Sequence, residues 1–338
     1  MGKTFCRRLI SRGVLPAFLI LGASLCFLIP PGQAQQKIYD DLFSVSFPSE
    51  KEGWASGRWG CLVHTADGGK TWVRQKTGVD LTLSSVCFIN ALEGWAVGEE
   101  GIILHTRDGG HIWKRQSSPI DLFHMKVFFI NSQVGWIVSE WTHILYTEDG
   151  GFTWQIQFRD QDFILKSISF CDPMNGWAVG EYGFIYHTRN GGKTWEKQGG
   201  RFGISKTTGD VEGGNYLFDV TAVDPQTAWA VGIDGTVIRT VNGGATWQEV
   251  PLRLPRTQLF GVTVQDRNKI LIGGNGVFLI SLDGGATWKT PRCTPPNIYN
   301  WIYGLSRRGK AGFAAVGGGG IIYFSEGDNP LSWKQIAY

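Results

Sequence analysis

The sequence has little net charge and few cysteines once its first residues are set apart. Residues 1–34 hold four basic residues and no acidic one, so the 32 Lys and Arg fall to 28 against 29 Asp and Glu. This balance gives no support for nucleic-acid binding. Four cysteines remain beyond residue 34, and none has a CxxC spacing. Disulfides among Cys61, Cys87, Cys171 and Cys293 stay an open alternative to buried thiols.

Motifs of common catalytic chemistry are also missing. The sequence has no Gly-rich phosphate loop, no Ser-His-Asp or Cys-His arrangement and no zinc-spaced cluster. His64, His105 and His187 recur at one position of a repeat, which indicates packing rather than catalysis. We therefore predict no catalytic residue, no metal site and no cofactor. A Ca²⁺ ion held by surface carboxylates is the alternative.

Long hydrophobic runs are confined to the start of the chain. Basic residues from Lys3 to Arg12 precede the apolar run Val14–Ile29, and residues 32–34 are small enough for a cleavage site. This order is typical of a secretory signal peptide over residues 1–34. We expect an exported protein, in a periplasm, a thylakoid lumen or on an extracellular surface. An uncleaved membrane anchor stays an alternative, although about 20 apolar residues are needed to span a bilayer.

Glycine and tryptophan are abundant, and they recur in a fixed pattern. Gly94-Trp95-Ala96-Val97-Gly98 and the Asp-Gly-Gly turn before Trp113 return after 41 residues. The turn tryptophans are Trp72, Trp113, Trp154, Trp195, Trp247, Trp288 and Trp333. Their spacings are 41, 41, 41, 52, 41 and 45 residues. Each unit predicts four short strands, and no stretch has a useful helical period.

Seven such units predict an all-β fold, a seven-bladed β-propeller of four-stranded antiparallel blades, over residues 35–338. The predicted blades are residues 41–78, 79–119, 120–160, 161–200, 216–253, 257–292 and 299–338, with an insertion at 199–215. A closed ring buries both faces of every blade. Blades one and seven either meet directly or are joined by an edge strand from residues 35–40.

The Asp-Gly-Gly turns are expected to be structural. A short carboxylate or amide closes the turn by accepting backbone N–H groups, and the following tryptophan packs between blades. An active site needs its groups once, whereas this turn occurs in every unit. The structural residues are Asp67, Trp72, Asp108, Trp113, Asp149, Trp154, Asn190, Trp195, Asn242, Trp247, Asp283 and Trp288.

The loops between the second and third strands lie at the opposite end of the ring. Their frame repeats while their central residues vary, which is typical of a scaffold that carries a binding site. Aromatic and acidic residues gather there in blades one to four, and the insertion opens on the same face. The predicted partner-binding residues are Arg58, Trp59, Glu99, Glu100, Glu140, Trp141, Glu181, Tyr182 and Arg201. The alternative is that these tips are polar only because they are solvated.

The turn Ser/Thr-x-Asp/Asn-Gly-Gly-x-Thr-Trp resembles the Asp-box, or BNR repeat, of sialidases and other propellers. With the Gly-Trp-Ala-Val-Gly strand, it makes the chain resemble the photosystem II assembly and stability factor family. That resemblance implies a non-enzymatic chaperone for an immature membrane-protein subunit. It implies a protein partner, no nucleic acid, contact with the membrane that is peripheral at most, and a monomer. The arginine patch of photosynthetic members has no counterpart that we can place here, so a non-photosynthetic relative is favoured.

A sialidase-like glycoside hydrolase or a carbohydrate-binding propeller is the alternative. Sialidase chemistry needs an arginine triad, a Tyr–Glu pair and an acid Asp, and the Arg-Ile-Pro motif usual in such enzymes is missing. Glu99, Glu140 and Glu181, on adjacent blades, are the carboxylates that another hydrolase would use.

Overall fold

The computed structural model describes residues 37–207, 211–297, 300–327 and 329–336. The chain divides into two compact units, residues 1–34 and 35–338. The predicted signal peptide lies outside the described residues, and all of the described strands belong to the second unit. No helix in the described part of the chain is long and apolar enough to cross a membrane.

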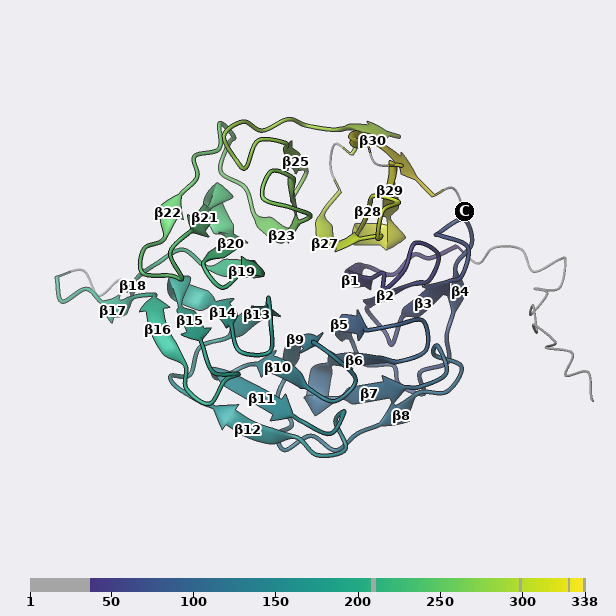
Figure 1. Ribbon diagram of the computed structural model, residues 1–338, viewed down its shortest axis with the longest axis horizontal. Coiled ribbons are helices and arrows are strands. Elements are labelled where there is room, and N and C mark those ends of the chain that lie inside the picture. The colour runs from purple at the N-terminus through teal and green to yellow at the C-terminus, as the bar shows by residue number, and fades with distance from the viewer. Residues whose placement is uncertain (1–36, 208–210, 298–299, 328, 337–338) are drawn as a thin grey trace, which may run out of the picture. The chain divides into compact units, whose positions relative to one another are not determined.

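Short strands form the blades of a ring (Figure 1). Blade 1 has β1 (Leu42–Ser46), β2 (Gly53–Gly57), β3 (Leu62–Thr65) and β4 (Val73–Arg74). Blade 2 has β5 (Leu83–Phe88), β6 (Gly94–Gly98), β7 (Ile103–Thr106) and β8 (Lys114–Arg115). Blade 3 has β9 (His124–Phe129), β10 (Gly135–Ser139), β11 (His143–Thr147) and β12 (Gln155–Phe158). Blade 4 has β13 (Leu165–Phe170), β14 (Gly176–Gly180), β15 (Ile185–Thr188) and β16 (Glu196–Gly199).

The later blades come after an insertion and are less regular. The insertion is a hairpin of β17 (Phe202–Ile204) and β18 (Val211–Gly213). Blade 5 has β19 (Leu217–Asp224), β20 (Thr227–Gly232), β21 (Val237–Thr240) and β22 (Gln248–Glu249). Blade 6 has β23 (Leu259–Val264), β24 (Ile270–Gly274) and β25 (Phe278–Ser281). Blade 7 has β27 (Ile302–Arg307), β28 (Phe313–Gly317), β29 (Ile322–Glu326) and β30 (Asn329–Gln335), with β26 (Arg292–Thr294) added at its outer edge. Single 3₁₀ turns are η1 (Glu99–Gly101), η2 (Glu181–Gly183), η3 (Ile233–Gly235) and η4 (Gly318–Gly320).

The predicted seven-bladed propeller is confirmed. The innermost strands β1, β5, β9, β13, β19, β23 and β27 contact one another in a complete cycle around the axis. Every sheet is antiparallel except for the outer pair β26 and β30, which is parallel. Blade 6 has three strands rather than four, because β26 pairs with blade 7 instead. The reason is Pro291, which occupies the position where Gln75 of blade 1 donates its main-chain N–H to Leu62. Proline has no N–H to donate, and the chain leaves blade 6 there for the edge of blade 7.

Blade 1 closes the ring by packing directly on blade 7. Residues 37–41 form no strand. Val45 and Phe47 share one apolar cluster with Val316 and Phe324, and the Phe47 and Phe324 ring centroids are 5.7 Å apart. At the rim, Gly319 donates its main-chain N–H to the Asp41 carboxylate at 2.8 Å. The described residues 37–40 therefore do not form the edge strand that residues 35–40 were expected to supply in the alternative arrangement.

An aromatic stack joins successive blades. Trp54 of blade 1 lies parallel to Phe88 of blade 2, with centroids 3.6 Å apart, and Trp113 meets the edge of Phe88 at 5.8 Å. The same stack recurs in the next two interfaces. Gly94 makes it fit, because a Cβ there would lie 2.5 Å from the Phe88 ring. The turn tryptophan therefore packs between blades, as predicted.

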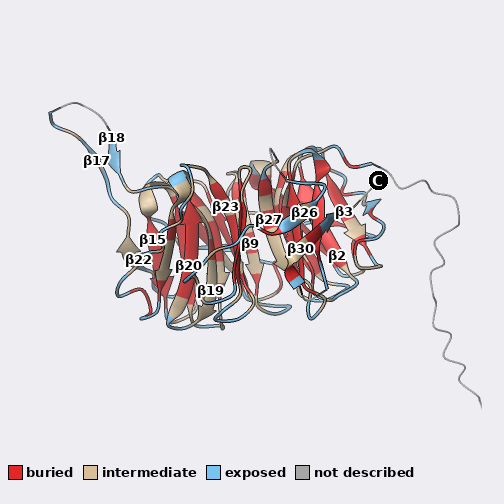
Figure 2. Ribbon diagram, turned by 90° about the horizontal axis from the view of Figure 1, so that it is seen from above, coloured by how far each residue is buried: buried red, intermediate tan, exposed pale blue. Residues whose placement is uncertain are grey.

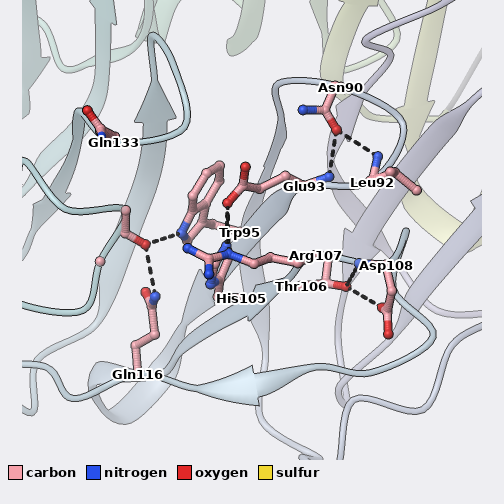
Figure 3. A network of polar contacts seen from close by, with 12 residues as sticks. Asn90, Leu92, Glu93, Trp95, His105, Thr106, Arg107, Asp108, Gln116 and Gln133 are labelled. Carbon is pink, nitrogen blue, oxygen red and sulfur yellow. Dashed lines mark hydrogen bonds and ion pairs between the residues drawn. The ribbon is translucent and has the colours of Figure 1, made fainter.

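A glutamine ties each of the first four blades to its successor. Gln116 on the outer edge of blade 2 donates to the Gly150 carbonyl at 3.0 Å and accepts the Trp154 indole N–H at 3.2 Å. Trp95 donates to the same carbonyl at 3.1 Å, as Figure 3 shows. Gln75, Gln157 and Gln198 make the corresponding bond to the next Asp-Gly-Gly turn. The tie crosses the blade interface, so it complements the apolar stack.

The four cysteines beyond residue 34 are free thiols, so the disulfide alternative fails. Cys61 is buried, and burial raises its pKa to about 12.

Candidate functional site

The Asp-Gly-Gly turns share one hydrogen-bonded geometry in the first six blades. In blade 1, one oxygen of Asp67 accepts the Thr65 hydroxyl at 2.8 Å and the Thr71 N–H at 2.9 Å. The Thr65 hydroxyl accepts the Gly69 N–H at 2.8 Å. Asp108, Asp149 and Asp283 repeat this, and the amides of Asn190 and Asn242 substitute for the carboxylate.

These hydrogen bonds hold the turn carboxylates ionised. Burial alone would raise the pKa of Asp67, but donors on Thr71 and Thr65 lower it. Hydrogen bonds from Thr287, first its hydroxyl and then its N–H, lower the pKa of Asp283 to about 2. Both carboxylate oxygens of Asp67, Asp149 and Asp283 accept hydrogen bonds from their own turns, so these groups hold the turn closed.

The loops between second and third strands occupy the other end of the ring. Each contacts the link into the next blade, as where Gly101 donates its N–H to Leu122. The residue at the tip has positive φ in five blades although none of these tips is glycine. The tips are Trp59 (φ 55°), Glu100 (φ 53°), Trp141 (φ 56°), Tyr182 (φ 54°) and Asp234 (φ 57°). A positive φ costs energy for a bulky residue, and glycine adopts it most easily. These five side chains therefore occupy positions where the backbone conformation alone would favour glycine.

Three predicted partner-binding glutamates have a main-chain role. The Glu99 carboxylate accepts the Thr82 N–H at 2.8 Å, and the Glu99 N–H donates back to the Thr82 carbonyl at 3.1 Å. We call this pair of hydrogen bonds a clasp. Glu140 makes the same clasp with Phe123, and Glu181 makes it with Ile164. Each clasp fixes a loop to the start of its own inner strand. The repeat of one geometry in three blades indicates loop support.

The remaining predicted residues divide by exposure. Trp59 is 68% exposed and Trp141 is 50% exposed. Glu100 is also exposed. Arg58 is held by an ion pair to Asp41 at 3.0 Å.

Tyr182 and Arg201 belong to the base of the β17–β18 hairpin, which projects from the ring in Figure 2. Tyr182 packs on Phe163, Phe202 and Tyr216, with ring centroids 4.9–5.0 Å apart. Arg201 donates its N–H to the Tyr182 carbonyl, while its side chain is exposed. The tip of blade 4 therefore supports the hairpin.

The mouth of the central channel opens at the same end as the tips. It has a volume of about 110 Å³ and is lined by the second residue of each inner strand. These residues are Phe43, Ser84, Met125, Lys166, Phe218, Phe260 and Tyr303. Four of them form a continuous aromatic arc in the order Phe218, Phe260, Tyr303, Phe43, with neighbouring centroids 5.4, 5.1 and 5.3 Å apart. The exposed Trp301 extends the arc and lies 5.7 Å from Phe260.

Two lysines face the arc from blades 3 and 4. Lys126 lies 3.7 Å from the Asp219 carboxylate, which also accepts the Ser167 hydroxyl at 2.6 Å and the Val262 N–H at 3.0 Å. Lys166 is half-buried, and burial lowers its pKa while Glu181 and Glu140 oppose that shift. Tyr303 is kept neutral because burial raises its pKa to about 12.

This channel mouth was not predicted from the sequence. A usable signal was present, because each of these residues follows the first residue of its inner strand, which is buried in all seven blades. Strand alternation then turns the next side chain to the axis. In the described residues, no three His, Cys, Asp or Glu side chains gather as metal ligands.

The fold and this end of the ring define a class of protein: a seven-bladed propeller with structural Asp-boxes at one end and variable aromatic tips around its channel at the other. Residues 32–118, 112–199 and 205–295 match the sequence profile of the family described as photosynthesis system II assembly factor YCF48. The chain belongs to that family.

Solved structures of YCF48 have the same fold. A structure described as YCF48 bound to D1 peptide is 23% identical and matches with a TM-score of 0.68, over 86% of this chain and 94% of that one. YCF48 from Cyanidioschyzon merolae is 21% identical with a TM-score of 0.68, over 86% and 97% of the two chains. No curated protein matches significantly.

An enzyme of another family also shares the fold. The GH74 xyloglucanase of Xanthomonas campestris is 13% identical with a TM-score of 0.70, over 90% of this chain and 55% of the enzyme. At this identity the likeness concerns the fold alone. The predicted family is therefore confirmed by sequence, and the fold by itself fits both binding proteins and hydrolases.

Proposed function

We propose that this protein is an exported, non-enzymatic assembly factor that binds a segment of a membrane-protein subunit. The observation that carries the proposal is the set of exposed aromatic tips, above all Trp59 and Trp141, held with positive φ at the end opposite the Asp-boxes. Rigid exposed aromatics are the side chains that anchor protein interfaces. Membership of the YCF48 family and the D1 peptide bound by a YCF48 protein support a protein partner.

Export brings the protein and its partner to the same compartment. The apolar run and small residues within residues 1–34 support a signal peptide. Fractionation of cells that express the full chain tests this point. An exported protein is recovered with the envelope or the exported fluid, at the mass of residues 35–338. Recovery of the unprocessed chain in the cytoplasm would contradict export.

Capture from the cell envelope tests partner binding. The chain is immobilised, and retained membrane subunits are identified by mass spectrometry. The double variant Trp59→Ser, Trp141→Ser should lose most of the capture, at least about tenfold, because two anchors are removed. The matched control is Phe152→Ser, since Phe152 is 67% exposed but lies in an Asp-box turn at the other end. Equal capture by both variants would contradict binding at the tips.

A glycoside hydrolase is the second candidate, favoured by the fold shared with GH74 enzymes. Its carboxylates would come from Glu99, Glu140 and Glu181, but each already accepts a main-chain N–H. Hydrolysis of chromogenic glycosides and xyloglucan by the full chain should stay at background. Activity that disappears in Glu140→Gln would support the enzyme instead.

A further inference from the structure

The channel mouth combines an apolar wall with a basic one. Phe43, Phe218, Phe260 and Tyr303 line it on blades 1, 5, 6 and 7, and Lys166 faces them from blade 4. One residue from every blade reaches this mouth, because the inner strands converge on the axis.

Lys166 is the unusual member of this ring. Among the described residues, no carboxylate lies at ion-pair distance from its ammonium group, whereas Lys126 has Asp219. The nearest acidic influences are Glu181 and Glu140, and both carboxylates are occupied by main-chain donors. A half-buried ammonium without a partner is costly, and an incoming anion would relieve that cost.

The size and the surrounding charges limit what can enter. A volume of about 110 Å³ holds a carboxylate and a few atoms attached to it, but no folded element. Glu140 and Glu181 act electrostatically on Lys166, and Asp219, paired with Lys126, also lines the mouth. These carboxylates would repel a polyanion. The aromatic arc next to the lysine favours an apolar side chain beside the anion.

We propose that the channel mouth binds a carboxylate carried by an extended peptide, with the adjacent apolar side chain packed on the Phe218–Phe260–Tyr303–Phe43 arc. Lys166 donates to the carboxylate, and the Tyr303 hydroxyl provides a second, neutral donor on the opposite wall. The proposal rests on the proposed function, because it takes a protein as the partner. It adds which chemical group of that partner is recognised.

Fluorescence polarisation of labelled peptides on the full chain tests this chemistry and separates two sources of the carboxylate. The first probe is Gly-Ser-Gly-Ser-Leu-Phe with a free carboxyl terminus. The second is the same peptide with a terminal amide. The third is amidated Gly-Ser-Glu-Phe-Gly-Ser, which carries its carboxylate on a side chain. We expect the first or the third probe to bind at least about tenfold more tightly than the second, the range of a charge-assisted hydrogen bond.

Variants then assign the binding to the channel mouth. Lys166→Met should weaken the preferred probe by about tenfold or more, and Lys166→Arg should restore much of the loss. Phe260→Ser should weaken the preferred probe but not the preference for a carboxylate. The matched control is Lys193→Met, because Lys193 is an exposed lysine in an Asp-box turn. Unchanged thermal unfolding of each variant shows that folding is intact.

Equal binding of all three probes, no binding of any, or wild-type affinity in Lys166→Met would overturn the carboxylate site. Preferential binding of xyloglucan oligosaccharides at the arc would also overturn it. Envelope capture through Trp59 and Trp141 is measured separately, so a failed peptide site leaves the proposed function to be decided by its own experiment.

Discussion

Blades 1–4 and blades 5–7 hold the same fold with different side chains. In the first group, a strand tryptophan, a phenylalanine from the next blade and the turn tryptophan stack in order across three interfaces. In the second, blade 6 has Leu271 at the strand-tryptophan position, since it pairs with Ile280 as Trp95 pairs with His105. Blade 5 places Arg239 over Trp229 at 5.2 Å. Both groups keep buried apolar faces. The ring therefore requires that each blade bury its apolar faces, and the tryptophan stack is one of several side-chain arrangements that achieve this.

The glutamine that ties one blade to the next is replaced by an apolar residue at two positions in the later blades. Val250 of blade 5 and Ile336 of blade 7 occupy the position of Gln116. The indole N–H groups that these positions would have served, on Trp288 and Trp72, have no partner among the described residues. Trp195 also lacks one, because Gln157 accepts from Trp136 instead. An unpaired buried N–H is tolerated here, at a cost of about 1–3 kcal/mol each.

The largest difference between the two groups should appear when the stack is removed. Trp95→Ala leaves a cavity beside Phe129, 3.5 Å away between centroids, and removes one of the two donors to the Gly150 carbonyl. We expect a loss of about 3–5 kcal/mol in unfolding free energy. The equivalent Leu271→Ala in blade 6 should cost toward the lower end of about 2–5 kcal/mol. Chemical denaturation measures both, and an equal or greater cost for Leu271→Ala would show that the stack adds nothing.

Acid should weaken blades 1–4 first, because all six histidines precede residue 188. Burial lowers the pKa of His124 to about 4 from its ordinary value of 6.5. The unfolded chain therefore binds a proton that the folded chain excludes between these values, so stability is complete above about pH 6.5 and falls toward pH 4. The full shift corresponds to about 3 kcal/mol.

His124→Asn tests this pH dependence in denaturation series from about pH 7.5 to about pH 4, which spans the window between the two pKa values. The variant should have a shallower fall in unfolding free energy than the wild type. The exposed His111 provides the control variant His111→Asn, which should keep the wild-type slope. A wild-type slope in His124→Asn would assign the acid sensitivity to other groups.

The smallest effect should come from exchanging the glutamine tie between the groups. Gln116→Val leaves the Trp154 N–H without its acceptor and the Gly150 carbonyl with the Trp95 N–H alone, at a cost of about 1–3 kcal/mol. Val250→Gln offers the Trp288 N–H an acceptor, so it should cost less than about 0.5 kcal/mol or stabilise. Thermal unfolding compares the two, and similar losses would show that the tie depends on its whole blade.

Several features of the fold were predictable because they repeat. The spacing of Trp72, Trp113, Trp154 and Trp195 was enough to predict the blades and the packing of the turn. The parallel strand β26 was not predicted, although Pro291 marks the place where blade 6 loses its fourth strand. The loss of an N–H at a proline predicts the loss of a strand only when the carbonyl that would have accepted that N–H is known.

The candidate site was predicted in part. The tips Trp59 and Trp141 are exposed, as a binding role needs. The clasp of Glu99 on Thr82 could not be foreseen, because their separation of 17 positions in sequence gives no sign that the two meet. The partner-binding role of the tips stays a prediction until capture is measured.

By itself, the sequence determined the number of blades and the family, because each depends on a pattern that returns along the chain. Only the tertiary structure decided which side chains share the channel. Phe43 and Tyr303 are 260 positions apart and their rings lie 5.3 Å apart. That proximity arises from closing the ring, since bringing the first and last inner strands together is a property of seven packed blades and of no single repeat.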